Sequence, residues 1–535
     1  MFISVSRLFG RISGAAVVLL PALAVAVGNP AAPAPREPGF VLTAIQFDGG
    51  NPLPEDGVDV LIEPFLGQWT TLADVEELRY RLTKHYVDQG YLNSGVVLVP
   101  NQDLSDGVLR VQVIAGTLAE VRVTGQGRLN PAYVSRRIHP DPEATFNRFE
   151  LQERFQLLLQ DPLIEQLQGG LQPGDGPGVA VLDLAVTPAR PWELYLRTDN
   201  ARPPSTGAVR AYVGGTLRNL TGWGDALDLY IGQSFEGQGR EGAIDWSIPL
   251  NARGTRVSIG YKRSDAPLIE ETLRELNIQS ETQRAEIALS HELWHNLQSS
   301  LELGLMLSWA ENKTTLLGKP FDFSPGSVSG ESRVSAARLL TNYARRSDRQ
   351  ALALYSQFSL GLDAMDATMH DFGWPDSDFF SWRGQAQYVR RLSDKGAQLI
   401  LRGAAQLSGD ILLPLERFSV GGMYTVRGYR ENTLVGDQGY AATIEARYPI
   451  WQGQGFAQTE QVLQLAVFSD VGSAWDHASF RKRQTIASVG LGLLWSLDER
   501  LRAKFYYGYA LEDIIEANED DLQDRGFNFL VQADF

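Results

Sequence analysis

The alternation of apolar and polar side chains from residue 192 onward constrains the fold of this chain more than any other feature. Segments of about 8 to 12 residues carry apolar side chains at every second position, which is the period of a strand with one apolar face. Polar or glycine-containing turns separate these segments, and no convincing long amphipathic helix interrupts them. The sixteen segments are 192–199, 207–217, 225–234, 241–250, 254–263, 281–293, 297–309, 332–341, 353–363, 380–391, 396–407, 438–449, 462–471, 484–496, 502–510 and 526–535.

The connections between the segments alternate in length, as they do in outer-membrane barrels with short turns at one end and long loops at the other. After residue 28 the sequence has no run of about 18 apolar residues, so a chain that crosses a membrane would have to cross it as a barrel. The pattern therefore predicts a transmembrane β-barrel of 16 antiparallel strands over residues 191–535, with a long loop at 408–437. A soluble β-sandwich is the alternative, and the loop pattern and the N-terminus weigh against it. The short connections are 251–253, 295–296, 393–396 and 497–500, and the long ones are 264–280, 310–331, 408–437 and 511–525.

The N-terminal residues are typical of a secretory signal peptide. Arg7 and Arg11 precede an apolar stretch, and the small residues Ala24-Val25-Ala26 resemble a cleavage site. We therefore expect a signal peptide at residues 1–26. A single anchor helix is the alternative, but the stretch is short for a membrane span. The Pro- and Ala-rich residues 27–39 predict a linker.

Two small α/β modules are expected between the linker and the barrel, at residues 40–116 and 117–190. In the first module, Thr71 and Asp74 form a capping-box pattern at the start of a long helix. The elements expected in the first module are a strand at 41–47, helices at 58–65 and 72–89, and strands at 96–99 and 108–114. Those expected in the second are a strand beginning at residue 118, helices at 131–138 and 149–160, and a strand at 179–186.

Composition excludes several classes of function. The chain has 48 Lys and Arg against 64 Asp and Glu, a formal net charge of −16, which argues against a nucleic-acid partner. It has no cysteine, so thiol catalysis, thiolate metal sites and disulfides are excluded. We find no convergent catalytic set, and we expect neither enzymatic activity nor a cofactor.

Two patterns suggest a metal site. His291-Glu292-Leu293-Trp294-His295 matches the HExxH pattern of metalloproteases, in which both histidines lie on one face of a helix. The surrounding residues alternate as a strand, which would separate the two histidines by about 13 Å, too far for one zinc ion. The acidic cluster at 512–524 is expected to be a solvated outer loop, with a divalent-ion site as the alternative. We therefore expect no metal site.

The longest loop and a later strand carry residues that could meet inside a barrel. The loop contains Val426-Arg427-Gly428-Tyr429, and the strand contains Phe468-Ser469-Asp470-Val471-Gly472. Alternation would point Phe468, Asp470 and Gly472 into the lumen. A carboxylate in the lumen needs a partner, and an arginine on an inward-folded loop can supply a bidentate one. The alternative is an exposed Arg427 and a solvated Asp470 that never meet.

These motifs resemble those of a known superfamily. The VRGY loop and the downstream FSDVG strand are similar to two motifs shared by outer-membrane insertases and two-partner secretion transporters of the haemolysin secretion/activation type. Residues 90–116 resemble the first periplasmic POTRA module of the transporters, and residues 171–186 resemble the end of their second module. Asp199-Asn200 and the stretch 219–225 resemble the opening hairpins of their barrel.

The resemblance implies a transporter in the bacterial outer membrane with its POTRA modules in the periplasm. It would capture an unfolded partner, an adhesin or haemolysin with an N-terminal secretion domain, by strand addition to a POTRA sheet edge and export it through the pore without a cofactor. The loop lock would comprise Val426, Arg427, Gly428, Tyr429, Phe468, Asp470 and Gly472.

The resemblance also implies how the barrel reaches and contacts its membrane. Phe535, the last residue of an alternating strand, would be the signal that outer-membrane assembly machinery recognises, and the barrel would contact lipid and lipopolysaccharide. Several members carry a helix before the first module that plugs the barrel. We expect no stable plug here, because residues 27–39 are rich in proline and glycine. An assembly insertase is the alternative function, and a passive porin would explain neither the modules nor the loop pair.

Overall fold

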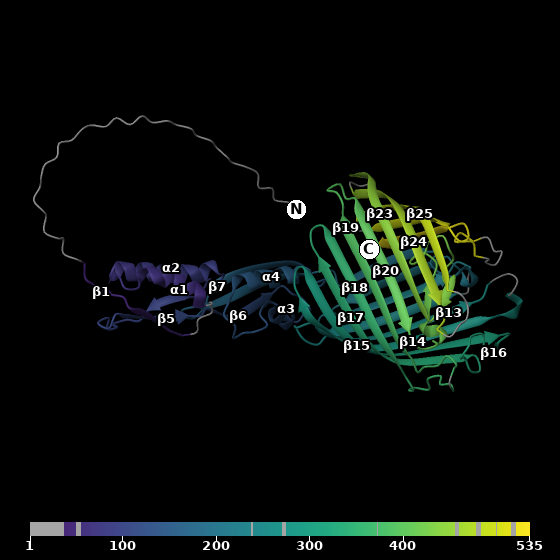
Figure 1. Cartoon of the computed structure of the whole chain (residues 1–535), viewed down its shortest axis with the longest axis horizontal. Helices are drawn as coiled ribbons and strands as arrows, with labels where there is room; N and C mark the ends of the chain where they lie inside the picture. Colours follow the sequence, from purple (N-terminus) through teal and green to yellow (C-terminus); the bar gives the residue numbers. More distant parts are fainter. Residues whose placement is uncertain are drawn as a thin grey trace, which may run out of the picture. The chain divides into compact units, whose positions relative to one another are not determined.

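The computed structural model describes residues 37–49, 55–236, 239–269, 274–371, 373–454, 459–477, 483–498, 500–514 and 521–535 (Figure 1). The expected signal peptide at 1–26, most of the expected linker and the expected absence of a plug helix lie outside the described residues. The chain forms two units, residues 1–85 with 96–113, and residues 86–95 with 114–535. Among the described residues, none of the helices combines the length and the apolar character that a membrane span requires.

The first α/β module contains a three-stranded sheet in the order β2-β5-β4, in which β2 and β5 run parallel. Val75, Leu78 and Leu82 are buried along one face of its long helix, as their spacing predicts. The elements are β1 (Gly39–Val41), β2 (Ala44–Asp48), α1 (Glu55–Ile62), the 3₁₀ turn η1 (Glu63–Phe65), β3 (Trp69–Thr71), α2 (Leu72–Asp88), β4 (Gly95–Leu98) and β5 (Val108–Ile114).

The predicted capping box forms at the start of α2. The Thr71 backbone N–H donates to Asp74 Oδ2 at 2.8 Å, and the Asp74 N–H donates to Thr71 Oγ1 at 3.3 Å. The bonds from the Thr71 backbone and hydroxyl hold the pKa of Asp74 below its ordinary value. The prediction of a single strand at 41–47 is wrong. The backbone changes partner within this stretch, because the Leu42 N–H donates to Gln68 O and the Thr43 N–H donates to Gly107 O. As a result β1 pairs with β3, and β2 pairs with β5.

The second module packs two helices on a three-stranded sheet in the order β6-β8-β7. Leu118, Val134, Ile138 and Leu184 belong to its buried core. Strand β7 was not predicted, because its polar sequence and Gly169-Gly170 hide the alternation of a strand. The elements are β6 (Thr117–Thr124), α3 (Pro131–Ile138), α4 (Arg148–Leu158), β7 (Ile164–Pro173) and β8 (Val179–Pro188).

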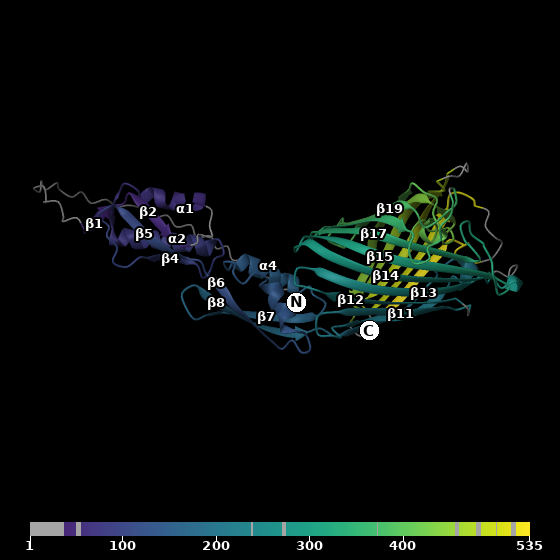
Figure 2. The ribbon, with the colours of Figure 1, turned by 90° about the horizontal axis from the view of Figure 1, so that it is seen from below.

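The rest of the chain forms a closed antiparallel barrel, so the predicted fold class is confirmed. Its sixteen long strands are the seven from β9 to β15, the four from β17 to β20 and the five from β23 to β27, and each overlaps one predicted segment. Figure 1 shows them side by side from teal to yellow, and Figure 2 shows the yellow C-terminal strands behind the teal ones. The short β16 (Lys319–Pro320) pairs antiparallel with the end of β15. The long strands are β9 (Trp192–Asp199), β10 (Arg210–Arg218), β11 (Ala226–Ser234), β12 (Arg240–Pro249), β13 (Thr255–Pro267), β14 (Gln279–His295), β15 (Ser299–Leu316), β17 (Glu331–Arg346), β18 (Gln350–Leu362), β19 (Phe380–Arg391), β20 (Gln398–Ser408), β23 (Gln438–Gln454), β24 (Glu460–Trp475), β25 (Gln484–Leu497), β26 (Leu501–Ala510) and β27 (Phe527–Asp534).

Alternation along each strand separates an outer apolar face from an inner polar one. In β24, the side chain of Val467 is 53% exposed, whereas its neighbour Phe468 is 3% exposed and Asp470 is 1% exposed. Strand β27 follows the same rule, with Phe527 exposed and Asn528 buried. The apolar residues therefore point out of the barrel, and the polar ones point into it.

The barrel closes where β27 pairs with β9 over Leu530–Asp534 and Tyr195–Asp199. The fully buried side chain of Asn200 continues this seam beyond the last strand pair. Its Nδ2 donates to Phe527 O at 2.9 Å, and its Oδ1 accepts from Phe529 N at 2.8 Å. One amide side chain thus satisfies a backbone donor and a backbone acceptor that would otherwise have no strand partner.

We predict that Asn200→Ala weakens the closing seam. The change removes the side-chain partners of the part-buried Phe529 N–H and Phe527 C=O, which should cost at most about 1–3 kcal/mol for each lost partner. The temperature at which the folded band is lost on heat-modifiable gels should fall. Asn342→Ala is the matched control, because the Asn342 amide bonds the side chain of Glu302 at an exposed position. Equal melting of the two variants would contradict the role of Asn200.

Candidate pore-loop site

The chain between β20 and β23 folds back into the barrel as a hairpin. After the 3₁₀ turn η4 (Pro414–Glu416), β21 (Phe418–Val420) pairs antiparallel with β22 (Leu434–Gly436). Val420 and Val426 are fully buried in one cluster with Ile486 of the barrel wall. Because these contacts are on the inward face of the wall, the loop occupies the lumen. We call residues 409–437 the pore loop.

Arg427, between β21 and β22 of the pore loop, forms a buried ion pair with Asp470 of β24. Its Nε donates to Asp470 Oδ2 at 2.8 Å, and its Nη2 donates to Asp470 Oδ1 at 2.9 Å. The Arg427 backbone N–H also donates to Oδ2, at 3.1 Å. The exposed fractions are 2% for Arg427 and 1% for Asp470. The structure thus brings together the two residues whose meeting the sequence left open.

A second carboxylate and two aromatic rings complete the surroundings of Arg427. Its Nη1 donates to Glu445 Oε2 of β23 at 2.6 Å. The guanidinium carbon lies 3.4 Å from the centroid of the Phe468 ring and 4.6 Å from that of Tyr506. The guanidinium therefore has charge-assisted bonds in its plane and aromatic rings over its faces, which is how a buried arginine is best satisfied.

Glycines permit the close approach of loop and wall. Gly428 has φ = +92°, and a Cβ there would lie 2.7 Å from Gly508 O of β26. A Cβ on Gly472 would lie 2.5 Å from Val420 Cγ1. A side chain at either position would push the loop from the wall.

Tyr429 extends the contact toward the last outer loop of the barrel. Its hydroxyl donates to Ala487 O at 2.9 Å and accepts from Glu512 N at 3.0 Å. All seven residues that we expected in the lock therefore lie in one contact region, while their role as a lock stays a prediction.

Sequence reasoning missed Glu445, Tyr506 and Gly508. Glu445 lies opposite Phe468 in the strand register and is fully buried, while the neighbouring Ile444 is 51% exposed. The alternation that placed Asp470 inward would have placed Glu445 inward as well, had it been applied to the segment 438–449. No local pattern distinguishes Tyr506 or Gly508 from other residues of β26.

The next residues of the pore loop contact the outer loop that precedes β27. The Nη2 of Arg430 donates to Asp524 Oδ2 at 2.7 Å, and the Glu431 N–H donates to Gln523 Oε1 at 2.9 Å. Burial raises the pKa of Glu431 to about 7. Glu512, Asp513 and Asp524, members of the acidic cluster expected to be solvated, are exposed.

The HExxH pattern does not form a metal site in the structure. Its residues belong to strand β14, as their alternation predicts. His291 Nδ1 lies 2.9 Å from Thr255 Oγ1, and His295 Nδ1 lies 3.0 Å from Glu292 Oε2. Within the described ranges, no group of three or more His, Cys, Asp or Glu residues is placed to hold a metal ion.

The geometry predicts an order of importance for the two carboxylates. Asp470→Asn should lower the free energy of unfolding by about 3–5 kcal/mol, because it leaves the buried Arg427 without its main partner. Glu445→Gln should cost less, since Arg427 keeps all its bonds to Asp470. Heat-modifiable gel melting of the two variants beside wild type measures this order. A larger loss for Glu445→Gln would contradict this order and would indicate that the bonds of Glu445 to Arg447 and Arg402 contribute more than the Asp470 pair.

Two α/β modules followed by a closed barrel with a folded loop in its lumen define a POTRA–barrel protein. A family profile for the haemolysin secretion/activation protein ShlB/FhaC/HecB matches residues 178–494, more than half of the 535 residues. A profile for the ShlB-type POTRA domain matches residues 40–116. The chain belongs to the haemolysin secretion/activation protein family, which confirms the resemblance seen in the sequence.

Individual relatives are distant. The chain is 27% identical over 229 residues to the heme/hemopexin transporter protein HuxB of Haemophilus influenzae (strain 86-028NP), a match that spans 42% of this chain and only 40% of HuxB. It is 25% identical over 421 residues to the outer membrane transporter CdiB of Escherichia coli, or 75% of this chain and 68% of CdiB.

Solved structures share the fold. CdiB from Escherichia coli superposes with a TM-score of 0.70 at 22% identity, covering 95% of this chain and 93% of that one. BamA from Haemophilus ducreyi lacking POTRA domains 1–3 superposes with a TM-score of 0.56 at 13% identity, covering 93% of this chain and 100% of that one. At these identities the similarity shows the fold alone.

Proposed function

We propose that this chain is a transporter of the bacterial outer membrane that exports an unfolded partner protein through its barrel, with the POTRA modules in the periplasm. Family membership and similarity to the transporters HuxB and CdiB support the class. The exposed apolar face of the barrel suits lipid and lipopolysaccharide. The observation that carries the proposal is the pore loop itself, which is folded inside the lumen and bonded to the wall through the ion pair of Arg427 with Asp470.

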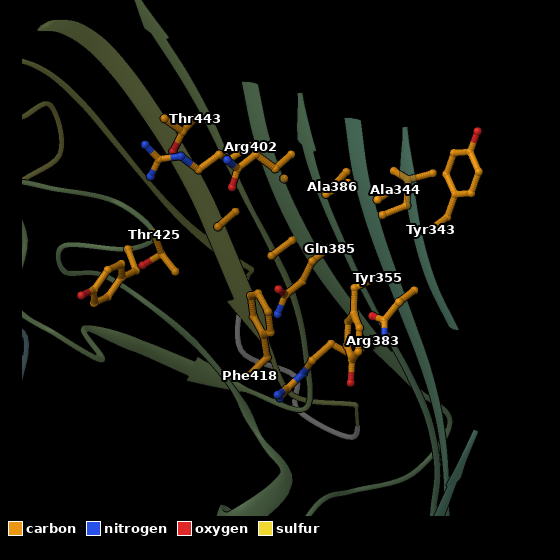
Figure 3. Close-up of a pocket in the computed structure, with 18 of the residues that line it drawn as sticks. Tyr343, Ala344, Tyr355, Arg383, Gln385, Ala386, Arg402, Phe418, Thr425 and Thr443 are labelled. Carbon is orange, nitrogen blue, oxygen red and sulfur yellow. The ribbon is translucent and has the colours of Figure 1, made fainter. Parts of the chain in front are cut away.

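A cavity of about 860 Å³ lies beside the pore loop (Figure 3). Tyr355, Gln385 and Arg402 line it from the wall strands, and Thr425 lies across it on the pore loop. These hydroxyl, amide and guanidinium groups can bond to the backbone of an extended chain, which carries a donor and an acceptor at nearly every residue. The cavity is thus a part of the lumen that is open while the loop is seated.

In this proposal the Arg427 lock holds the pore loop in the resting position, and loop movement widens the lumen during export. An unseated loop would leave Arg427 and the buried Asp470 without their ion pair, which favours return to the seat, whereas Glu445 would keep its bond to Arg447. Transport needs no reaction chemistry in this scheme, so catalysis and cofactors are not part of the proposal. The module boundaries given above, and the recognition of Phe535 by the assembly machinery, are also proposed.

We place the capture site for the partner at strand β7. It forms one edge of the second POTRA sheet, and its only sheet partner in the described structure is β8. Its ten residues include a single charge, Glu165, and most are exposed. A long edge strand with few charged residues can accept an added strand. By contrast, the edge strand β4 of the first module has only four residues and offers a shorter edge. An extended segment of the partner's secretion domain could pair along β7.

We predict that Gln168→Lys reduces capture and export of the partner. A lysine on an edge strand opposes strand addition. Ala185→Lys is the matched control, because Ala185 is exposed and lies opposite Gln168 on the central strand β8, where no strand can be added. Export into the medium and site-specific crosslinking from β7 to the partner should fall only for Gln168→Lys. Equal effects of the two changes would show that the β7 edge is not used.

We also predict that Arg427→Ala and Asp470→Ala each reduce export while the barrel still assembles. Either change removes the contact that seats the loop, and heat-modifiable gel migration checks assembly. The charge-swapped pair Arg427→Asp with Asp470→Arg should partly restore export, because it rebuilds an ion pair. Unchanged export in both single variants would rule out the lock as part of transport.

The assembly insertase is the alternative that the fold also allows, since BamA shares it. Depletion distinguishes the two functions. A transporter should leave the levels of unrelated outer-membrane proteins unchanged, whereas depletion of an insertase should lower many of them.

A further inference from the structure

We propose that Arg338 and Glu416 form a second anchor, which holds the base of the pore loop, and that the loop leaves the lumen only when both anchors release. Arg338 Nη2 donates to Glu416 Oε1 at 2.7 Å, and its Nη1 donates to Oε2 at 3.0 Å. Arg338 is 5% exposed and Glu416 is 8% exposed. The inference rests on the proposed function only in treating the barrel as a pore.

The wall side of this second anchor is rigid. Arg338 belongs to β17, and its remaining bonds reach the strands on both sides. Its Nε donates to Ser308 Oγ of β15 at 2.9 Å, and its Nη1 also donates to Ser359 Oγ of β18 at 2.8 Å. The guanidinium is thereby held in one orientation by three neighbouring strands before it meets the loop.

The loop side is equally well seated. Gln406 Nε2 of β20 donates to Glu416 O at 2.8 Å. Leu412 and Leu413, just before η4, are buried in one cluster with Val334 of β17 and with Phe379. The base of the pore loop is therefore packed on the wall around β17 through apolar contacts as well as through charge.

The two anchors hold the loop to different parts of the wall. Between β17 and β24 the barrel contains β18, β19, β20 and β23 in that order. The pore loop thus runs from one region of the wall to another across the lumen. The cavity of Figure 3 is bordered by these wall strands and by loop residues from both halves, Leu415 and Thr425 among them.

The loop carries the positive charge at one anchor and the negative charge at the other. At the Arg427 anchor, the loop carries the cation and the wall carries the carboxylates, whereas at the Glu416 anchor the loop carries the carboxylate and the wall the cation. A shifted loop would bring Arg427 toward Arg338, or Glu416 toward Asp470, and like charges would oppose each other. The arrangement specifies one seat, and breaking one anchor leaves the other to hold it.

Single-channel conductance of the purified full chain in planar bilayers tests this, because it requires no partner protein. Arg427→Ala and Glu416→Gln should each raise conductance modestly, since one anchor remains. The double variant should exceed the product of the two single effects by about fivefold, as expected for two residues coupled in one function. The matched control combines Arg427→Ala with Glu311→Gln, because Glu311 pairs with Arg333 within the wall. A double variant that equals the product, or that matches this control, would overturn the proposal.

A cysteine at Leu413 reports on the base of the loop alone, because the chain has no other thiol. Leu413 is fully buried, so a maleimide should react slowly with Leu413→Cys. Adding Glu416→Gln should accelerate labelling several-fold, and adding Arg427→Ala should not. Equal acceleration by both changes would show that the loop has a single anchor.

If Glu416→Gln does not assemble, Arg338→Met with Glu416→Leu replaces it in both experiments, since this pair removes the charges without leaving one unpaired. The proposal would also be overturned if this variant had the same conductance as the parent protein and its Leu413→Cys form were labelled at the parent rate. If the double variant shows the expected conductance but the wild type exports no partner, the proposed function is contradicted and the second anchor is still supported.

Discussion

The rest of the structure depends on how one guanidinium is accommodated inside the barrel. A buried, unpaired charge is strongly unfavourable, so Arg427 can enter the lumen only where the wall offers carboxylates. Asp470 and Glu445 stand on the adjacent strands β24 and β23, and both face inward. The register of β23 against β24 brings these two carboxylates together, and closure of the barrel makes the face that carries them the wall of a lumen. The position of the pore loop therefore depends on the register of this strand pair.

The chemistry of the two anchors suits a loop that must stay in place and also move. Replacing a buried ion pair by apolar side chains is often neutral or stabilising, so such a pair contributes position more than net stability. The bidentate bonds of Arg427 and Arg338 specify where the loop sits. An apolar plug of similar size would have no comparable preference for one seat.

Much of the fold was predictable because strand periodicity is local. Each of the sixteen predicted barrel segments corresponds to one strand, although boundaries moved, as where the segment 297–309 became Ser299–Leu316. Prediction failed where tertiary contacts override the local pattern. The expected strand at 41–47 divides because its backbone changes partner, and β7 pairs with β8 although Gly169-Gly170 and polar side chains conceal its alternation.

The sequence by itself determined that the chain makes a barrel, which faces of its strands point inward, and that Arg427 and Asp470 could meet. It left open whether they do, because they are 43 residues apart and nothing local relates them. Only the tertiary structure decided that Glu445 and Tyr506 share the site and that Arg338 meets Glu416, 78 residues away. Periodicity reports the side of a sheet on which a residue lies. Which residues meet across a lumen depends on barrel closure, strand register and the path of a folded loop, and these follow from the whole chain.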